Sequence, residues 1–445
     1  MRHHKNPAPA RIKPNIPEFV AFILERLTLA GHQAFIVGGA VRNALLRQPI
    51  TDWDVATSAP TKEIKKIFHD IRFFSLKHST ITLVHAGRLF EVTAFRGKNG
   101  SLEDDLARRD FTINAIAFDP QKREMLDPFG GRGDIRGKLI RAVGDPAARF
   151  QEDPLRLLRA ARFASELGFQ VEDTTLKILT HMAPLLHTIA TERIKDELIK
   201  ILISPKPSVG FNLTRRTGLL KQFLPELLEN YQKRQNAHHR YTVFKHIMET
   251  IDRVEPELLL RLTALFHDIA KARAREKVDG RWRFFGHEAE SADLTAEILG
   301  RLKFSNHMIV KVTNLIRHHM ISYDSQWSNA AVRRLIHRVG PENIIDLIRL
   351  RRADIIAHGL DSQEGVLLEE LEKRIEDQMK GSIPTNIRDL AINGHTVMEI
   401  LGLSPGPEVG SILSELIEKI IDNPQLNTKS RLTAMLKHIK LSDLT

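Results

Sequence analysis

Two aspartates, Asp52 and Asp54, stand on either side of Trp53 in the segment TDWDVA. We expect this segment to form a strand, and because side chains alternate along a strand, both carboxylates would point to one face. Two negative charges so close together are unfavourable unless a cation lies between them. Mg²⁺ prefers oxygen ligands and usually shares them with substrate phosphates. The pair therefore predicts a Mg²⁺ site for phosphoryl or nucleotidyl transfer, with an ordinary surface turn as the alternative.

A phosphate-binding turn is predicted just upstream, where Gly38 and Gly39 separate the apolar segment AFIV from the helical segment VRNALL. Glycines let a phosphate approach the backbone closely, since no Cβ intervenes, and the N–H groups at a helix start favour anions. Arg42, on the first turn of that helix, could pair with the same anion. A plain strand–turn–helix junction is the alternative. Glu91, in the apolar strand RLFEVTAF, is a candidate third carboxylate, or else a charge at a sheet edge.

Four motifs in one order resemble the bacterial class II tRNA nucleotidyltransferase family, which contains CCA-adding enzymes and poly(A) polymerases. Across residues ~35–225 they read GGAVRNALLRQPITDWDVATSAP, LARRDFTINAIAFD, EDPLRLLRAARFASELGF and TERIKDELIKILIS. The resemblance implies a polymerase-β-like head in which Asp52 and Asp54 are the catalytic Mg²⁺ ligands. It implies that Arg109 and Asp110 contact the phosphate and ribose of the nucleotide. It also implies addition of CC or CCA to the 3′ end of tRNA, from CTP and ATP, without a nucleic-acid template.

The motif E-D-x-x-R supplies the residues that would read the nucleobase. Asp153 and Arg156 are three apart, so on a helix they would share a face. A carboxylate can accept from the cytosine amine while a guanidinium donates to the ring acceptors. The resemblance implies that this pair is a protein template for C, and for A after a small shift. A plain salt bridge on a solvated helix is the alternative.

Two departures from the family pattern bear on the product. Asn43 stands where the family usually has Asp, which affects the local geometry. Between FEVTAFR and LARRDF there is only GKNGSLEDD, within residues 97–107. Full CCA-adding members carry a longer loop here, and enzymes that add only the two cytidines resemble this sequence in lacking it. The short loop therefore favours CC addition over CCA addition. The segment RFFSLKHSTITLV resembles the tRNA-specific branch more than poly(A) polymerases.

A second constellation of histidines and aspartates occupies the C-terminal half of the chain. Its order resembles the HD family of metal-dependent phosphohydrolases, and imidazole with carboxylate suits divalent transition metals. The resemblance implies ligands from separate helices of one bundle, a second divalent metal and trimming of a 2′,3′-cyclic phosphate from tRNA ends. A helical body that only supports tRNA is the alternative. The candidate ligands are His246, His267, Asp268, His287, His318, His319 and Asp354.

Composition restricts the class of protein. The chain has 445 residues, a net charge of +11 and no cysteine, which excludes disulfides and thiolate zinc sites. Residues 1–150 contain 24 Lys and Arg against 16 Asp and Glu, an excess that favours a polyanionic partner. Neither a signal peptide nor a transmembrane stretch is evident. We therefore expect a cytoplasmic protein that binds tRNA, CTP and ATP, with no membrane or DNA partner.

The elements that must position these residues change in character along the chain. Strand and helix patterns alternate up to about residue 145, and helical periodicity dominates afterwards. We expect an α+β fold with a flexible basic arm (1–17), a mixed-sheet head (18–145), an all-α neck (146–228), an HD-type bundle (236–360) and a helical tail (361–445). Three functions compete: a tRNA nucleotidyltransferase or its poly(A)-adding relative, an HD phosphohydrolase whose head only binds RNA, and a non-catalytic tRNA-binding protein. Paired metal carboxylates argue against the last.

Overall fold

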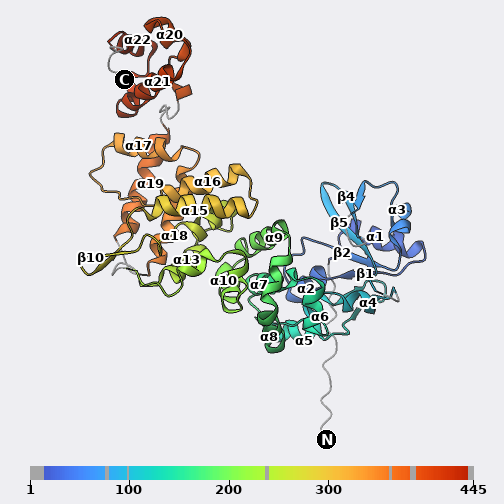
Figure 1. Ribbon diagram of the computed structural model, residues 1–445. Coiled ribbons are helices and arrows are strands. Elements are labelled where there is room, and N and C mark those ends of the chain that lie inside the picture. Colours follow the sequence, from blue (N-terminus) through green and yellow to red (C-terminus); the bar gives the residue numbers. More distant parts are fainter. Residues whose placement is uncertain are drawn as a thin grey trace. The chain divides into compact units, whose positions relative to one another are not determined.

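The computed structural model describes residues 15–75, 80–97, 100–235, 240–359, 363–380 and 387–438. Most of the predicted basic arm lies outside the described residues. The chain divides into two compact units, which are coloured along the sequence in Figure 1 and are described separately below. One unit comprises Met1–Ile201 and Val209–Phe223, and the other comprises Leu202–Ser208 and Leu224–Thr445. The predicted α+β class, with a mixed-sheet head followed by helices, is confirmed.

A seven-stranded mixed sheet in the order β3-β4-β5-β2-β1-β6-β7 forms the centre of the first unit. Strands β2 and β5 run parallel, whereas the other neighbours are antiparallel. Strands β4 and β5 form a hairpin, and its turn at Ala86 and Gly87 has φ of 48° and 74°, as a tight turn between twisted strands requires. The strands are β1 (Ala34–Val37), β2 (Asp54–Thr57), β3 (Phe73–Ser75), β4 (Thr80–His85), β5 (Arg88–Ala94), β6 (Ala117–Asp119) and β7 (Glu124–Leu126).

Helices cover this sheet and continue into the predicted neck. Phe35 and Val37 alternate along β1 and pack with Leu102 and Leu106 of α4 (Leu102–Ala107) in one apolar core. Short strands β8 (Leu139–Ile140) and β9 (Gln170–Val171) pair beside the neck helices. The other helices are α1 (Glu18–Leu29), α2 (Gly39–Leu46), α3 (Thr61–Ile67), α5 (Gly131–Gly137), α6 (Pro146–Glu152), α7 (Leu155–Leu167), α8 (Asp173–Met182), α9 (Thr191–Leu202), α10 (Pro207–Arg216) and α11 (Leu220–Phe223).

The expectation that Asp153 and Arg156 share one helix face is wrong. Helix α6 ends before Asp153, whose backbone is extended with φ −148° and ψ 97°. Pro154 explains the break, because a proline ring clashes with a helical conformation of the preceding residue. Asp153 therefore lies at the junction of two helices, and Arg156 lies on the first turn of α7.

In the part of the second unit that the structure describes, the regular elements are helices, apart from a two-stranded ribbon of β10 (Glu276–Val278) and β11 (Arg281–Arg283). Helices α20 to α22 enclose an apolar core of their own that includes Ile412, Leu416 and Leu432. Among the described helices of the chain, none is both long and apolar enough to cross a membrane. The helices are α12 (Glu226–Glu229), α13 (Val243–Arg253), α14 (Leu258–Phe266), α15 (His287–Arg301), α16 (Asn306–Arg317), α17 (Asn329–Val339), α18 (Ile344–Ala357), α19 (Glu364–Lys380), α20 (Gly394–Leu401), α21 (Pro407–Asp422) and α22 (Lys429–His438).

Candidate active site and metal centre

A cleft of about 510 Å³ in the first unit collects the predicted site residues of the head. Its walls come from the turn after β1, from β2 and β5, and from the helices near Asp153. The predicted residues that line it are Gly38, Gly39, Arg42, Asp52, Asp54, Glu91, Arg109, Asp110, Asp153 and Arg156. Residues separated by more than 100 positions thus converge on one cavity.

Three carboxylates meet on one wall of this cleft. Asp54 begins β2 and lies opposite Glu91 in the parallel register, while Asp52 lies just before the strand. Burial raises the pKa of Asp54, and Asp52 raises it further, although Arg109 opposes both. Desolvation by the cleft also raises the pKa of Glu91, with Asp54 and Asp52 adding to it. Since β5 lies between β4 and β2, Glu91 is not a charge at the sheet edge. The donor set suits a hard divalent cation such as Mg²⁺.

Gly38 permits the close approach on which this wall depends. Its φ is 71°, a conformation that other residues rarely adopt. A Cβ at this position would lie 2.7 Å from Nη1 of Arg109 and 3.2 Å from Oδ2 of Asp54. The glycine therefore leaves room for the arginine and the carboxylate beside the start of α2.

The position of Arg109 depends on Asp105, a residue that the sequence analysis missed. Asp105 is fully buried, and its Oδ2 accepts from Nε and Nη2 of Arg109 at 3.3 and 3.2 Å. Its Oδ1 accepts from Nε of Arg96 at 2.7 Å. Burial raises the pKa of Asp105, but Arg109 and Arg96 outweigh it and lower the pKa below its usual value. The short segment after β5 thus ends in a buried carboxylate that orients two arginines lining the cleft.

Arg42 has neutral hydrogen-bond partners. Its Nε and Nη2 donate to Oδ1 of Asn43 at 3.1 and 3.0 Å, and its Nη1 donates to Oδ1 of Asn114 at 2.6 Å. Burial lowers the pKa of Arg42. Asn43 therefore replaces the usual Asp with an uncharged acceptor, so that residue 43 does not neutralise the guanidinium. The arginine can contribute its charge to an anion in the cleft.

Asp110 is buried and already paired. Its Oδ2 lies 2.7 Å from Nη2 of Arg159, and its Oδ1 accepts from the Phe111 N–H and from Nδ2 of Asn114. Burial raises the pKa of Asp110, but Arg159 and the hydrogen bonds outweigh it and lower the pKa. The carboxylate is therefore ionised and held in a fixed direction.

Asp153 and Arg156 line the same cleft, but their side chains do not pair with each other. Nη2 of Arg193, on α9, lies 2.9 Å from Oδ2 of Asp153. Nη1 of Arg156 lies 2.7 Å from Oε2 of Glu152, and its Nη2 donates to the carbonyl of Arg108 at 2.8 Å. The alternative of a simple salt bridge between Asp153 and Arg156 is therefore not what the structure contains. Arg193 is a second residue that the sequence analysis missed.

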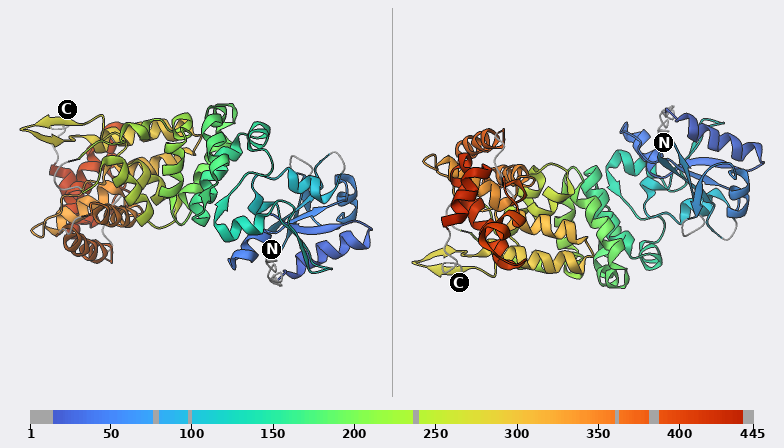
Figure 2. Two further views of the ribbon diagram at one scale, coloured as in Figure 1. Left: turned by 90° about the horizontal axis from the view of Figure 1, so that it is seen from below. Right: turned by 90° about the horizontal axis from the view of Figure 1, so that it is seen from above.

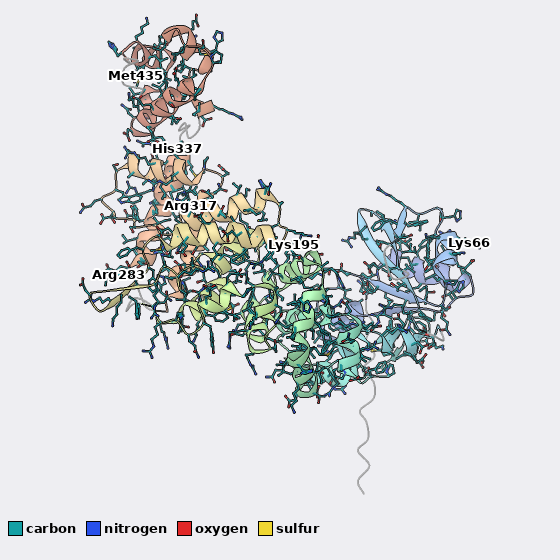
Figure 3. The ribbon with its side chains drawn as sticks, in the orientation of Figure 1. Lys66, Lys195, Arg283, Arg317, His337 and Met435 are labelled. Carbon is teal, nitrogen blue, oxygen red and sulfur yellow. The ribbon has the colours of Figure 1, made fainter. Side chains whose placement is uncertain are left out.

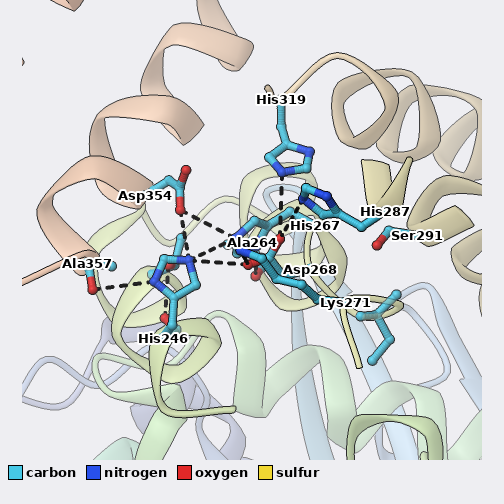
Figure 4. A network of polar contacts seen from close by, with 12 residues as sticks. His246, Ala264, His267, Asp268, Lys271, His287, Ser291, His319, Asp354 and Ala357 are labelled. Carbon is cyan, nitrogen blue, oxygen red and sulfur yellow. Dashed lines mark hydrogen bonds and ion pairs between the residues drawn. The ribbon is translucent and has the colours of Figure 1, made fainter. Parts of the chain in front are cut away.

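The second unit brings six of the seven predicted HD residues together, as Figure 4 shows. One group consists of His246, His267 and Asp354, and the other of Asp268, His287 and His319, with ligand atoms within 4.8 Å of one another in each. All six residues are buried. They come from α13, the end of α14, the start of α15, the end of α16 and α18. His318 is in neither group.

The histidine tautomers in this cluster fit a metal. Nδ1 of each ring faces a backbone carbonyl, at 3.4 Å for His246, 2.9 Å for His267 and 2.7 Å for both His287 and His319. A carbonyl only accepts, so each Nδ1 carries the hydrogen, and Nε2 is the ring atom that faces the cluster. Burial and the neighbouring His267 lower the pKa of His319 to about 3, which keeps that ring neutral.

Ligand atoms crowd together in the cluster, and two of them, Oδ1 of Asp268 and Nε2 of His287, have no hydrogen-bond partner among the described residues. Nε2 of His246 and Nε2 of His267 lie only 3.2 Å apart. Both unpartnered atoms are buried. Such orphaned polar atoms are costly unless an ion or water satisfies them. The chemistry of the donors therefore fits a divalent transition metal.

Three further side chains complete the surroundings of the cluster. Nζ of Lys271 lies 2.8 Å from Oδ2 of Asp268, and Arg351 pairs with Oδ2 of Asp354. In each carboxylate one oxygen contacts a cationic side chain, and Oδ1 of each faces a histidine, His246 for Asp354 and His287 for Asp268. His358, which the sequence analysis missed, is buried with Nε2 3.7 Å from Oδ1 of Asp354. Its spacing of four from Asp354 on α18 was the available signal.

Comparisons with known proteins agree with this geometry. The family described as "Poly A polymerase head domain" matches residues 34–141, "Probable RNA and SrmB- binding site of polymerase A" matches 168–230, and "tRNA nucleotidyltransferase domain 2" matches 276–436. The chain is 34% identical to the A-adding tRNA nucleotidyltransferase of Deinococcus radiodurans, over 86% of this chain and 91% of that protein. It is 31% identical to the CCA-adding enzyme of Limosilactobacillus reuteri, over 97% and 98%.

The chain belongs to the tRNA nucleotidyltransferase family. Among solved structures, the Bacillus stearothermophilus CCA-adding enzyme in complex with CTP matches with a TM-score of 0.71 and 30% identity, covering 93% of this chain and 95% of that one. The family expected from the sequence motifs is therefore confirmed.

The contact at Gly38 generates a prediction. Gly38→Ala should weaken the binding of Mg²⁺–CTP about tenfold, because the new Cβ displaces Arg109 and strains the backbone. Isothermal titration of the purified variants measures this. Gly39→Ala is a matched control, since its Cβ would meet Nη2 of Arg42 at an ordinary 3.6 Å. Equal dissociation constants for the two variants would contradict the role given to Gly38.

Proposed function

We propose that this protein extends the 3′ end of tRNA with cytidine from CTP, without a nucleic-acid template, and that CC is its product. The observation that carries the proposal is the cleft in which Asp52, Asp54 and Glu91 face Arg42 and Arg109. Such a site has carboxylates for a divalent cation on one side and cations for a triphosphate on the other. The relatives named as CCA-adding enzymes support nucleotide addition to tRNA.

The residues of the cleft have two roles, one in holding a metal ion and one in binding the triphosphate. Asp52 and Asp54, with Glu91 beside them, would hold Mg²⁺, which when bound stabilises charge on the attacking and leaving oxygens. The turn at Gly38 and the guanidinium of Arg109 bind and orient the triphosphate. Arg109 is fixed before substrate arrives, because the buried carboxylate of Asp105 holds its guanidinium, and preorganisation is the main source of rate in such sites.

Base selection would fall to the junction before α7. Asp153 and Arg156 line the cleft with a carboxylate and a guanidinium, which complement the amine and ring acceptors of cytosine. Arg108 and Arg149 hold Arg156 through their carbonyls, at 2.8 and 2.9 Å. Arg193 holds Asp153 in turn. A and C can both engage such a pair, so the limit of the product depends on the surroundings.

The short segment 97–107 supports CC addition as the limit. Its second half is α4, whose Asp105 is buried and tied to Arg96 and Arg109. Because Asp105 holds the segment in these ion pairs, few of its residues are left to rearrange between the addition of one nucleotide and the next. Lys98 and Asn99, near its start, lie outside the described residues.

Removal of the first carboxylate tests the catalytic assignment. Asp52→Ala should lower the rate of radiolabelled CTP incorporation by at least about 100-fold while tRNA binding stays unchanged, because the cation ligand is lost but the RNA surface is not. A gel-shift assay with the same tRNA checks binding. Glu63→Gln, which removes a carboxylate on the exposed side of α3, should keep full activity. Retained incorporation in Asp52→Ala would refute the assignment.

The product itself tests the subtype. Incubation with CTP and ATP of a tRNA that lacks its CCA end should give a product ending in CC, read by sequencing of the 3′ end. A product ending in CCA would contradict the CC-only assignment. Extension only of a tRNA that already ends in CC would instead point to the A-adding activity named for the Deinococcus relative. A run of adenosines would favour the poly(A) alternative.

A second activity, metal-dependent phosphohydrolysis in the second unit, is favoured by the orphaned atoms of the histidine–aspartate cluster. We propose that residues 236–360 form an HD-type domain that trims a 2′,3′-cyclic phosphate from RNA ends. The six clustered residues would hold one or two divalent transition metals, which when bound activate water for attack on phosphorus. Lys271 and Arg351 keep both carboxylates ionised and oriented for this task.

Metal analysis tests this second activity. His267→Ala should abolish the hydrolytic opening of a 2′,3′-cyclic phosphate at an RNA end to a phosphomonoester and reduce the metal content of the purified protein, while CTP incorporation stays at its wild-type rate. His307, on α16 outside the cluster, offers the matched control His307→Ala. Inductively coupled plasma mass spectrometry gives the metal content. Equal metal content and equal hydrolysis of the cyclic phosphate in both variants would overturn the proposal.

A further inference from the structure

In the sequence, a two-stranded ribbon follows α14 and precedes α15, two helices whose ends carry residues of the histidine–aspartate cluster. The chain leaves α14 through His267 and Asp268, forms β10 and β11, and returns at His287, the first residue of α15. In Figures 1 and 2 the ribbon extends away from the helices of the second unit. Residues Glu276 to Gly280 are all exposed, so no described element covers the tip.

The ribbon carries positive charge that the described residues leave unpaired. Lys277, Arg281 and Arg283 are exposed, and none of them forms an ion pair within the described ranges. Figure 3 shows Arg283 on this ribbon. Arg275 stacks on Trp282, with Cζ 3.4 Å from the ring centroid. Aromatic rings and guanidinium groups next to free cations are the features by which proteins bind single-stranded nucleic acid.

Phe284, the residue after the ribbon, contacts residues of the cluster and its surroundings. Nζ of Lys271, which pairs with Asp268, lies 5.5 Å from the ring centroid of Phe284. Phe284 follows β11 and is buried, and its carbonyl faces Nδ1 of His287. The next residue, Phe285, is 68% exposed, which is unusual for a phenylalanine. Two aromatic residues, Phe284 and Phe285, thus lie within three positions of His287, which belongs to the cluster.

We propose that the ribbon β10–β11, together with Phe285, binds single-stranded RNA and directs its phosphorylated 3′ end to the cluster. The inference rests on the phosphohydrolase proposed above for its destination, but the RNA contact itself does not need hydrolysis. Lys277, Arg281 and Arg283 would contact backbone phosphates, and Trp282 and Phe285 would stack on bases. The register of the ribbon places Lys277 opposite Trp282, and so gives a cation and a ring to the same stretch of strand.

The test compares two double variants of the full-length protein. Arg281→Glu/Arg283→Glu should raise the KM for a short single-stranded RNA with a 2′,3′-cyclic phosphate about tenfold or more, with kcat for bis(p-nitrophenyl) phosphate unchanged. The salt dependence of the RNA KM should fall by about 0.7 in log–log slope for each lost phosphate contact. Lys429→Glu/Lys437→Glu, two exposed lysines of α22, is the charge-matched control and should leave both substrates unaffected.

Crosslinking separates the ribbon from the hydrolase. Ultraviolet crosslinking of the same RNA to the wild-type protein, followed by mass spectrometry, should attach RNA to the peptide that contains Trp282 and Phe285. If the wild-type protein hydrolyses neither substrate, the phosphohydrolase proposal fails, and such a crosslink still supports the ribbon. No crosslink on this peptide, or an unchanged RNA KM in the ribbon variant, overturns the inference. Binding of the ribbon to anionic vesicles without an RNA crosslink overturns it as well.

Discussion

Repulsion among Asp52, Asp54 and Glu91 is the constraint that organises the first unit. The parallel register of β2 and β5 sets Asp54 opposite Glu91, and the segment before β2 adds Asp52. Arg109 offsets part of this charge and can do so only because Gly38 has no side chain. Asp105 then fixes Arg109 from the far side. Each residue in this series makes room for another or holds it in place. Together they line a cleft with carboxylates on one side and cations on the other.

The second unit meets a related constraint with other ligands. Its buried carboxylates Asp268 and Asp354 lie among four imidazoles, and burial of such groups is unfavourable unless each one has a partner. Lys271 and Arg351 satisfy one oxygen of each carboxylate, and backbone carbonyls satisfy one nitrogen of each ring. What remains are lone pairs that face one another across about 3 Å. That residual electrostatic imbalance is the physical reason to expect a cation there.

Much of the candidate site could be predicted from the sequence, because its residues sit in short local patterns. Gly38, Asp52 and Asp54 lie within 17 positions, and each owes its place to a strand end or a turn. Asp105 and Arg193 were not predicted, although Asp105 is four positions from Arg109 and Arg193 lies in the motif TERIKDELIKILIS. The pairs of Asp105 with Arg96 and of Arg193 with Asp153 join residues of different elements. His318 and His319 were indistinguishable in sequence. Only the end of α16 decides that His319 turns inward and that His318 does not join either group.

The sequence by itself determined the family, the alternation of strands and helices in the first unit, and the identity of most ligands, because these follow from local spacing and residue type. It also contained the reason for its own wrong expectation, since Pro154 breaks the helix on which Asp153 and Arg156 were to share a face. Only the tertiary structure decided which charges pair. The pairs of Arg193 with Asp153 and of Arg159 with Asp110 depend on how elements pack and on side-chain direction. Coulomb energy depends on distance and burial, and neither quantity is fixed until the chain has folded.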